Sequence, residues 1–364
     1  MNTFLKESKK FASLLEPTLV VLGNEACDLD SAVSAIALAY FLHRIGRHAP
    51  RNVIPVLNIP RKELPLKTEV TYFLQKKSLD LENLVCNDEI RLNELKEAQK
   101  LSTVLVDHNF NTKFGHLAVQ VLDHHQFDPN SNLPETCEKR IELVGSCASI
   151  VADHIFESTE GDLESLSLLY AAIVLDTVNF SKDADKAREL DFRMAEKIEK
   201  LLNIKNIEQH RVELMEELIK ARSDVSSLNA AQILYKDLKI IKNPAGNKII
   251  AIPGFPISVE DFVKKENSEE KLREFAEENN CDVILLMGLK IIDGVIHRDL
   301  GLINIRDEKL FEKVSEALQN YNPSLQLEAR SNISFMSGQF FKQLNLKASR
   351  KQILPLTKAV LDTF

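Results

Sequence analysis

Two short apolar runs, each ending abruptly in polar, metal-binding residue types, constrain the fold of this chain most. The runs are residues 101–106 and 117–122, followed by Asp107-His108-Asn109 and Asp123-His124-His125 respectively. Their length and composition predict buried strands. Carboxyl ends of strands in an open parallel sheet lie along one edge, where ligands bind. One Asp-His pair would indicate an ordinary surface turn, whereas two pairs at matching strand ends predict a metal centre.

A third acidic cluster lies upstream, at the end of another predicted strand. Residues 18–22 form a continuous apolar run of the kind buried in a parallel sheet, and a helix with one apolar face begins near Ser31. Gly23 permits a tight exit from the strand. Between strand and helix stand Asp28 and Asp30. Either acid can cap the helix, but capping does not explain two carboxylates spaced two residues apart, which could converge on two adjacent ions.

A fourth acid, Asp176, follows a long apolar helix predicted over residues 162–178. The pattern places Asp176 in a buried position near the helix end. An unpaired buried carboxylate is costly, so it needs a cation, a capping role or a proton. A helix cap is the alternative to a metal ligand here.

The remaining pattern predicts an alternation of strands and helices in the first half of the chain. The predicted strands are 51–59 and 141–144, and the predicted helices are 68–76, 89–100, 146–156 and 201–223. Residues 1–10 lack a secretory apolar core, so we expect an ordinary first helix, with a mitochondrial presequence as the alternative. We therefore expect a cytoplasmic protein, or alternatively one of the mitochondrial matrix.

Composition narrows the classes of function. A chain of 364 residues suggests two domains, and its net charge of −8 argues against a broad nucleic-acid-binding face. It leaves room for a small anionic substrate held by metal ions and a few local cations. The five cysteines show no CxxC spacing, which fits a reducing compartment rather than disulfides or a structural zinc site. No run is long enough to predict a membrane span.

The candidate ligands are mostly carboxylates with a little imidazole, a mixture that suits Mg²⁺ or Mn²⁺. Several carboxylates in one pocket would raise each other's pKa unless cations neutralise them. Two divalent ions would do so, and such a pair can activate a water for attack at phosphorus. The helix that begins near Ser31 points its N-terminus at the same place, which also favours anions.

Together these residues resemble the motifs of the DHH phosphoesterase superfamily. The motifs are Asn24-x-x-x-Asp28-x-Asp30, Asp107-His108-Asn109, Asp123-His124-His125 and Asp176. The stretch 23–31 is close to the prune proteins and short-chain exopolyphosphatases. The stretch 349–355 is similar to the end of family II inorganic pyrophosphatases, which carry a DHHA2 domain. The resemblance covers nearly the whole chain, and the set of motifs is more specific than any one of them.

The resemblance implies an α/β fold of two domains with the active site in the cleft between them. A parallel-sheet DHH domain, residues 1–222, would bind the metals, and a smaller mixed-sheet α/β DHHA2 domain, residues 226–364, would bind substrate. The second-half pattern agrees: it predicts a hairpin (239–241 and 248–252), strands 282–287 and 300–305, and helices 259–279, 308–319 and 350–364.

The resemblance also implies a role for each candidate residue. One divalent cation would be bound by Asp28 and Asp107, with Asn24 where pyrophosphatases have histidine. The other would be bound by Asp30, Asp107, His124 and Asp176, which makes Asp107 the bridging ligand. Asp123 and His108 would support these ligands from behind. Phosphate would be contacted by His125, Lys239, Arg350 and Lys351, and His125 could also protonate the leaving oxygen. Asp107, His125 and Arg350 are thus the candidate catalytic residues.

Two departures from the family pattern bear on the substrate. Asn24 replaces a strong imidazole ligand, which should weaken one metal site, favour Mg²⁺ and point away from a dedicated pyrophosphatase. His125 is kept, whereas vertebrate prune-like sequences tend to have arginine there, so substrate preference stays open.

We therefore expect a metal-dependent phosphoanhydride hydrolase acting on short polyphosphates or other small phosphorylated substrates. One alternative is a cyclic-nucleotide (cAMP) phosphodiesterase on the same site. A nanoRNase or cyclic-dinucleotide phosphodiesterase is disfavoured, because that branch of the superfamily has a glycine-rich GGGH-type motif in its partner domain. No two glycines are adjacent in this chain. Another alternative is an interaction scaffold with weak activity. It is weakened because every candidate metal-binding acid is retained and we expect no disordered tail after the last helix. No nucleic-acid polymer or membrane is expected as a partner, and protein partners are unknown.

Overall fold

The computed structural model describes residues 1–46, 52–158, 162–292 and 294–364. Their contacts divide the chain into two units, Met1–Arg222 and Ser223–Phe364. Each unit is built on its own six-stranded sheet. Among the residues described, no helix is both long and apolar enough to cross a membrane.

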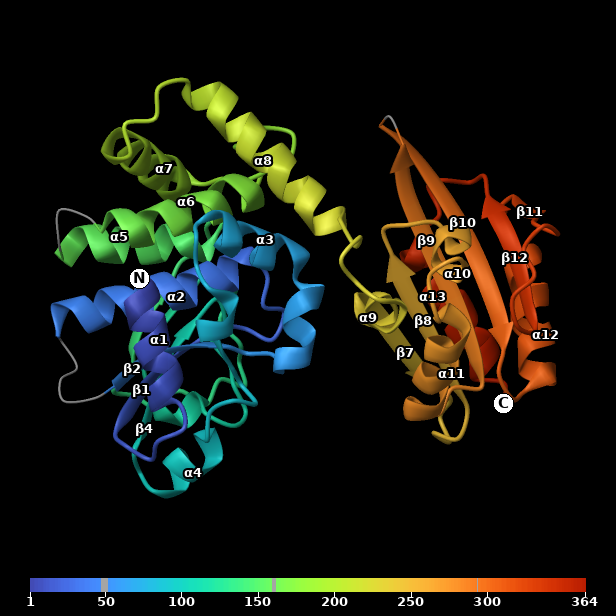
Figure 1. Ribbon diagram of the computed structural model, residues 1–364, viewed down its shortest axis with the longest axis horizontal. Helices are drawn as coiled ribbons and strands as arrows, with labels where there is room; N and C mark the ends of the chain where they lie inside the picture. The colour runs from blue at the N-terminus through green and yellow to red at the C-terminus, as the bar shows by residue number, and fades with distance from the viewer. Residues whose placement is uncertain (47–51, 159–161, 293) are drawn as a thin grey trace. The chain divides into compact units, whose positions relative to one another are not determined.

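The sheet of the first unit is entirely parallel, as expected, with strand order β3-β2-β1-β4-β5-β6. Figure 1 labels β1, β2 and β4 of this sheet. Its strands are β1 (Thr18–Leu22), β2 (Asn52–Leu57), β3 (Val85–Cys86), β4 (Leu101–Val106), β5 (Ala118–Asp123) and β6 (Glu138–Ile141). This order places β1 and β4 in the middle, next to β5. The carboxyl ends of the three strands that carry the acidic motifs are therefore neighbours.

Helices cover both faces of this sheet. They are α1 (Asn2–Phe11), α2 (Leu29–Ile45), α3 (Thr68–Lys76), α4 (Leu92–Glu97), α5 (Cys147–Ser158), α6 (Leu163–Asp176), α7 (Glu189–Leu201) and α8 (Ile207–Ser223), with 3₁₀ turns η1 (Arg61–Leu66), η2 (Leu81–Asn83) and η3 (Gly115–Leu117). Alternate residues of β1 face opposite sides: Leu19 and Val21 join the core under α2, α5 and α6, whereas Val20 and Leu22 join the core that includes α4. Both faces of β1 are thus buried.

The second unit has a mixed sheet, also as expected, with strand order β11-β12-β10-β9-β8-β7. Its strands are β7 (Asp237–Lys242), β8 (Ile249–Phe255), β9 (Val283–Ile292), β10 (Val295–Asn304), β11 (Leu327–Ala329) and β12 (Gly338–Gln343). Neighbours pair antiparallel, except that β8 and β9 pair parallel. Its helices are α9 (Ala230–Tyr235), α10 (Val259–Val263), α11 (Ser268–Glu278), α12 (Glu308–Gln319) and α13 (Arg350–Leu361). Apolar residues of α12 and α13 pack with one sheet face to form the main core of this unit.

Several expected elements differ from those observed. The strand expected at 141–144 is β6, which ends at Ile141, where its pairing with β5 stops at Asp123. The helices expected at 201–223 and 259–279 are each interrupted, at Asn203 and at Asn267, both with positive φ. The helix expected at 89–100 is the shorter α4, and Gln99 beyond it has a φ of 56°. The strand expected at 51–59 is β2, and Arg51 lies outside the described residues.

Candidate metal centre

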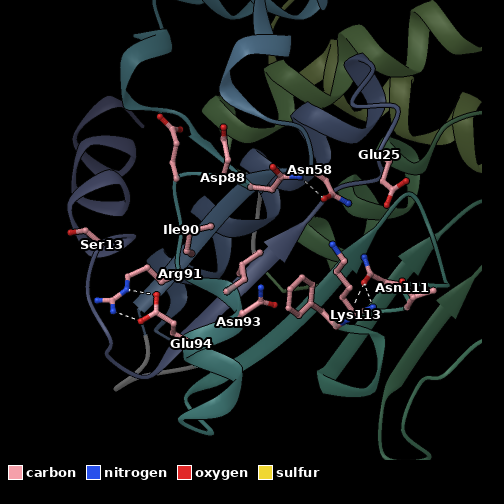
Figure 2. A pocket seen from close by; sticks show the side chains of 15 residues that line it. Ser13, Glu25, Asn58, Asp88, Ile90, Arg91, Asn93, Glu94, Asn111 and Lys113 are labelled. Atoms are coloured by element: carbon pink, nitrogen blue, oxygen red, sulfur yellow. Dashed lines mark hydrogen bonds and ion pairs between the residues drawn. The ribbon is translucent and has the colours of Figure 1, made fainter. Parts of the chain in front are cut away.

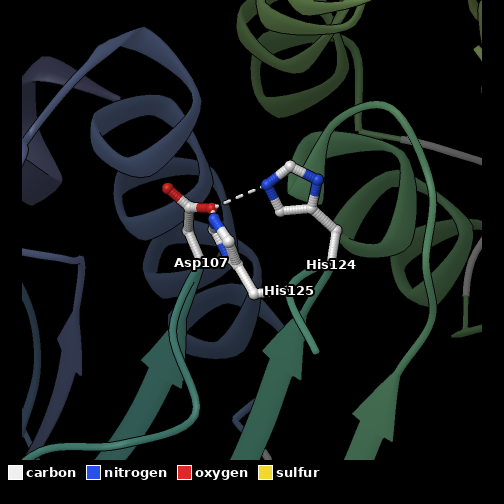
Figure 3. A group of neighbouring side chains, drawn as sticks. All are labelled: Asp107, His124 and His125. Atoms are coloured by element: carbon white, nitrogen blue, oxygen red, sulfur yellow. Dashed lines mark ion pairs between the residues drawn. The ribbon is translucent and has the colours of Figure 1, made fainter. Parts of the chain in front are cut away.

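The ends of β4 and β5 bring Asp107, His124 and His125 together (Figure 3). One potential ligand atom from each of these residues lies within 4.8 Å of the others. Asp107 is 2 % exposed and has a φ of 63°, so the chain turns sharply as it leaves β4. Aspartate is among the few residues that tolerate this left-handed conformation. The two strand ends singled out in the sequence therefore form one group.

His124 points one ring nitrogen at the acidic residues. Its Nε2 lies 3.1 Å from Asp107 Oδ1 and 3.8 Å from Asp30 Oδ2, while its Nδ1 lies 3.0 Å from the carbonyl oxygen of Val144. Because that carbonyl can only accept, Nδ1 carries a hydrogen, and Nε2 is left for the site. Burial opposes a charge on the ring, but the adjacent carboxylate of Asp107 raises the pKa of His124 to about 10 in the metal-free protein.

His125 is held from behind by Asp123. Asp123 is fully buried, and its Oδ1 lies 2.9 Å from His125 Nδ1 and accepts from the His125 backbone N–H at 3.1 Å. This hydrogen bond raises the pKa of His125. The other Asp123 oxygen accepts from Asn109 Nδ2 at 2.6 Å. The side chain of His125 is 56 % exposed, so its Nε2 is left as the nitrogen for a substrate.

Asn109, which ends the Asp-His-Asn motif, was given no role of its own from the sequence. Its amide donates to Asp123, and its Oδ1 accepts from the backbone N–H of Asp128 at 2.7 Å. Its position just after Asp107, a candidate metal ligand at a strand end, was the available signal. His108, expected to support the ligands, places Nδ1 2.9 Å from the carbonyl of Val106, and burial lowers its pKa. It forms no ion pair within 4.0 Å among the described residues.

Asp28 and Asp30 both lie at helix N-termini. Asp28 caps α2, because its Oδ1 accepts from the backbone N–H of Ser31 at 3.1 Å. Asp30 is 3 % exposed and accepts from the backbone N–H groups of Cys147 and Ala148, at 2.7 and 2.8 Å, which begin α5. The positive ends of two helix dipoles therefore meet at Asp30. Capping thus explains Asp28 in part, as the sequence allowed.

Asn24 lies beside Asp107, but as a donor. Its Nδ2 donates to Asp107 Oδ2 at 2.6 Å, and its Oδ1 accepts from the backbone N–H of Cys27 at 3.0 Å. The two partners fix the amide orientation, because a carboxylate can only accept and a backbone N–H can only donate. The amide oxygen that a cation would need is therefore turned towards Cys27.

Asp176 ends α6, as the sequence predicted. Burial, together with the charges of Asp28 and Asp107, raises the pKa of Asp176 to about 7. Directly after it, three consecutive residues have positive φ: Val178, Asn179 and Phe180.

The electrostatics of this cluster fit divalent cations. Burial and the charges of neighbouring carboxylates raise the pKa values of Asp30, Asp107 and Asp176 together. In the metal-free protein, His124 is the close cationic side chain that offsets these charges. A carboxylate-rich donor set with one free imidazole nitrogen suits Mg²⁺ or Mn²⁺ better than a soft metal. Divalent cations, Mg²⁺ or Mn²⁺, are thus the cofactors that these residues fit.

The expected phosphate-binding cations lie in the second unit. Arg350 begins α13 and donates through its guanidinium to both the carbonyl and the carboxylate of Asp237, at 2.8 Å each. Lys239 is exposed on β7, two residues after Asp237 and hence on the same face of that strand. Lys351 follows Arg350 and is exposed. Arg350 and Lys239 thus share one region at the edge strand β7.

The chain matches two family models. The model described as "DHH family, N-terminal domain" matches residues 18–174, and that of the "DHHA2 domain" matches residues 216–360.

Three relatives illustrate what the chain is similar to. It is 34 % identical to "Exopolyphosphatase PRUNE1" of Homo sapiens, over 100 % of this chain and 80 % of the relative. It is 27 % identical to a "Putative exopolyphosphatase" of Schizosaccharomyces pombe, over 92 % and 89 % of the two chains. It is 24 % identical to a "Manganese-dependent inorganic pyrophosphatase" of Methanocaldococcus jannaschii, over 92 % and 96 %.

Proposed function

The chain belongs to the DHH family of proteins that also carry a DHHA2 domain, and we propose that it is a metal-dependent exopolyphosphatase that hydrolyses the terminal phosphoanhydride bond of short polyphosphates. The observation that carries this proposal is the convergence of Asp107, His124 and His125 at one sheet edge in a chain related to exopolyphosphatases over its full length. Relatives that include a manganese-dependent pyrophosphatase support the same class of bond.

The first unit, residues 1–222, is proposed to hold two divalent cations. The proposed ligands are Asn24, Asp28, Asp30, Asp107, His124 and Asp176. In the metal-free protein Asn24 donates to Asp107. When bound, such ions activate a water and neutralise the oxygens around phosphorus. The protein's own contribution is to hold these carboxylates close together against their mutual repulsion. Helix N-termini at Asp30 and the protonated His124 help to do so in the metal-free state.

His125 is proposed to contact the phosphate and protonate the leaving oxygen. Asp123 holds its Nδ1 and raises its pKa, so the ring stays protonated at higher pH than an ordinary histidine. When the ring is protonated, the exposed Nε2 is a hydrogen-bond donor. The proton can pass from Nε2 to the departing phosphate oxygen while Asp123 stabilises the ring.

The DHHA2 domain, predicted as residues 226–364 and lying within the second unit, is proposed to bind the substrate. Arg350, Lys351 and Lys239 supply its cations, and a guanidinium can grip a phosphate through two parallel hydrogen bonds. Asp237 holds Arg350 through two of its donors and so orients the guanidinium. These residues would neutralise the phosphates that remain after the terminal one has left.

The deciding experiment is phosphate release from tri- and tetrapolyphosphate, pyrophosphate and cAMP, each with Mg²⁺ or Mn²⁺. We expect release from the polyphosphates to exceed release from the other two substrates. The three relatives are named for phosphoanhydride substrates, so a cAMP phosphodiesterase is not favoured. Absence of release from every substrate, in protein shown by calorimetry to bind Mn²⁺, would reject the enzyme and leave the scaffold alternative.

A cytoplasmic location is proposed as well. All five cysteines are free and buried, which fits a reducing compartment. Fractionation of cells tests this, and recovery with the mitochondrial matrix would favour the alternative. The same proposal assigns no nucleic-acid polymer and no membrane as partner, in line with the net charge of −8.

A further inference from the structure

The backbone directly after Asp176 is strained. Val178, Asn179 and Phe180 have φ values of 52°, 50° and 57°, so three consecutive residues other than glycine are left-handed. A left-handed β-branched residue such as Val178 is a genuine outlier. Such conformations persist only where the surroundings impose them, and they gather at functional sites. This turn therefore needs a structural cause, and it lies next to a proposed metal ligand.

Hydrogen bonds close the turn onto α6. The backbone N–H of Asn179 donates to the carbonyl of Val174 at 2.8 Å. The hydroxyl of Thr177 donates to the carbonyl of Ile173 at 2.6 Å and accepts from the N–H of Phe180 at 3.3 Å. These bonds tie the turn to Ile173 and Val174 near the end of α6. Asp176 lies in the sequence between these two residues and the turn. A movement of the turn would therefore move Asp176.

The far end of the turn is held by Phe180. The guanidinium carbon of Arg211, on α8, lies 4.3 Å from the centroid of the Phe180 ring, and the ring of Phe192, on α7, lies 5.0 Å away. A cation over an aromatic face is attractive, more so when it is shielded from water. The ring of Phe180 thus contacts side chains from α7 and α8.

Arg211 is itself held rigidly. Its Nε and Nη2 donate to the two carboxylate oxygens of Glu199, on α7, at 2.6 and 3.0 Å, and Glu199 is 2 % exposed. The hydroxyl of Tyr170, on α6, donates to the same carboxylate at 2.7 Å. The contacts therefore run from Phe180, just after α6, through Arg211 and Glu199 to Tyr170, which lies on α6 itself. Both ends of this series lie at the helix that carries Asp176. A bidentate arginine–carboxylate pair fixes direction as well as distance.

We propose that Arg211 is a positioning residue for the metal centre: held by Glu199, it clamps Phe180 and so keeps the left-handed turn that presents Asp176. This rests on the proposed function only in taking Asp176 as a metal ligand. Arg211 is not among the residues proposed to bind the substrate or the ions. Its effect passes through the turn, so it should change metal affinity through the placement of one carboxylate.

Replacement of Arg211 by lysine tests the proposal, because lysine keeps the charge but loses the planar fork. We expect the affinity for Mn²⁺, measured by calorimetry on the full chain without substrate, to fall by about 10- to 100-fold, the usual effect of losing a residue that orients a ligand. The matched control is Arg61→Lys. Arg61 makes the same two-pronged pair with Glu89, at 3.0 and 2.7 Å, in the same unit, and its other partners are backbone carbonyls.

The control variant Arg61→Lys should have a lower melting temperature and an unchanged affinity for Mn²⁺. If Arg211 had only a structural role, Arg211→Lys would show the same two results. If Arg211→Lys does not fold, Phe180→Leu removes the clamped ring and keeps the Arg211–Glu199 pair, with the same expected loss of affinity. Wild-type affinity in the folded variant, whatever its melting temperature, would overturn the proposal. Phosphate release by the wild-type protein is measured separately, so failure of the proposed function would not be confused with failure of this inference.

Discussion

Asp107 combines a left-handed backbone, deep burial and contacts to three other candidate residues. Asn24 donates to one carboxylate oxygen, and His124 and His125 lie 3.1 and 3.7 Å from the other. Asp107→Asn keeps the shape of the side chain but removes the charge shared between the two proposed ions. We expect phosphate release to fall by more than about 100-fold, the scale of losing one electrostatic stabiliser of a transition state.

The same substitution should not unfold the protein, because it also relieves repulsion among buried carboxylates. Thermal unfolding of the metal-free variant should therefore occur at or above the wild-type temperature. Asp88→Asn is the matched control: Asp88 lies just beyond β3 at the same sheet edge and accepts from the backbone N–H of Arg61. Comparable loss of activity in both variants would show that Asp107 has no special role.

Asp176 makes the metal-free protein sensitive to pH. Its pKa of about 7 in the folded state lies above its ordinary value of 3.8. Folding therefore favours the protonated form, so the stability that this group supplies is complete below about pH 4 and is lost as pH rises towards 7. We expect the melting temperature of chelator-treated protein to fall across this interval, and that of Asp176→Asn to fall less.

Mn²⁺ must displace the same proton, so its affinity for the wild-type protein should rise between pH 5 and about pH 7. Calorimetry in buffers of different ionisation enthalpy would count the protons released. An identical pH dependence of melting in wild type and Asp176→Asn would refute the assignment of the titration to this carboxylate.

Asp191, a fully buried acid on α7, forms hydrogen bonds that join α7 to the start of α5. Its carboxylate accepts from the backbone N–H groups of Gly145 and Arg188, both at 2.7 Å, and from the Ser149 hydroxyl at 2.6 Å. It thereby caps α7 and fixes the loop whose Val144 carbonyl orients His124. The packing of these helices thus bears directly on the metal centre.

Asp191→Asn would turn an NH₂ group towards donors that need an acceptor. We expect a loss of about 2–4 kcal/mol in the free energy of unfolding, measured in urea, because buried donors would be left without partners. Asp185→Asn should change it by less than about 0.5 kcal/mol, since the Asp185 side chain is 88 % exposed and its pair with Arg188 is loose. Equal effects would mean that the Asp191 network adds little.

Elements defined by strong local patterns were predictable from the sequence. The runs that became β1, β4 and β5 are apolar and end in polar residues, so their type and their shared edge followed directly. The interruptions at Asn203 and Asn267 did not, because a left-handed asparagine inside a helical pattern costs little and leaves the periodicity intact. The position of β6 depends on pairing with β5, which no local pattern encodes.

The acidic residues of the site were also predictable, but their mutual arrangement was not. Asp30 accepts hydrogen bonds from Cys147 and Ala148, which lie 117 and 118 positions further along the chain. Asn24 donates to Asp107, 83 positions away. Such pairs are set by the packing of whole helices on the sheet. For the same reason the sequence could not predict that Asn24, a candidate ligand, donates its amide NH₂ to Asp107 in the metal-free protein.

The whole molecule consists of two units, each with its own sheet and its own apolar core. The proposed metal ligands all lie in Met1–Arg222, and the proposed phosphate-binding cations Lys239, Arg350 and Lys351 all lie in Ser223–Phe364. Metal binding and catalysis should therefore separate if the chain is divided between the units. Each core is large enough for a domain to fold alone.

We expect residues 1–222, expressed alone, to fold and bind Mn²⁺ with an affinity within about threefold of the full chain, because no proposed ligand is lost. Phosphate release should fall by more than about 100-fold, since the arginine and lysines that grip the phosphate are missing. Circular dichroism, calorimetry and phosphate release measure the three properties on the same sample. Full activity of the isolated first unit would contradict the role given to Arg350, whereas loss of Mn²⁺ binding from a folded first unit would place a ligand in the second.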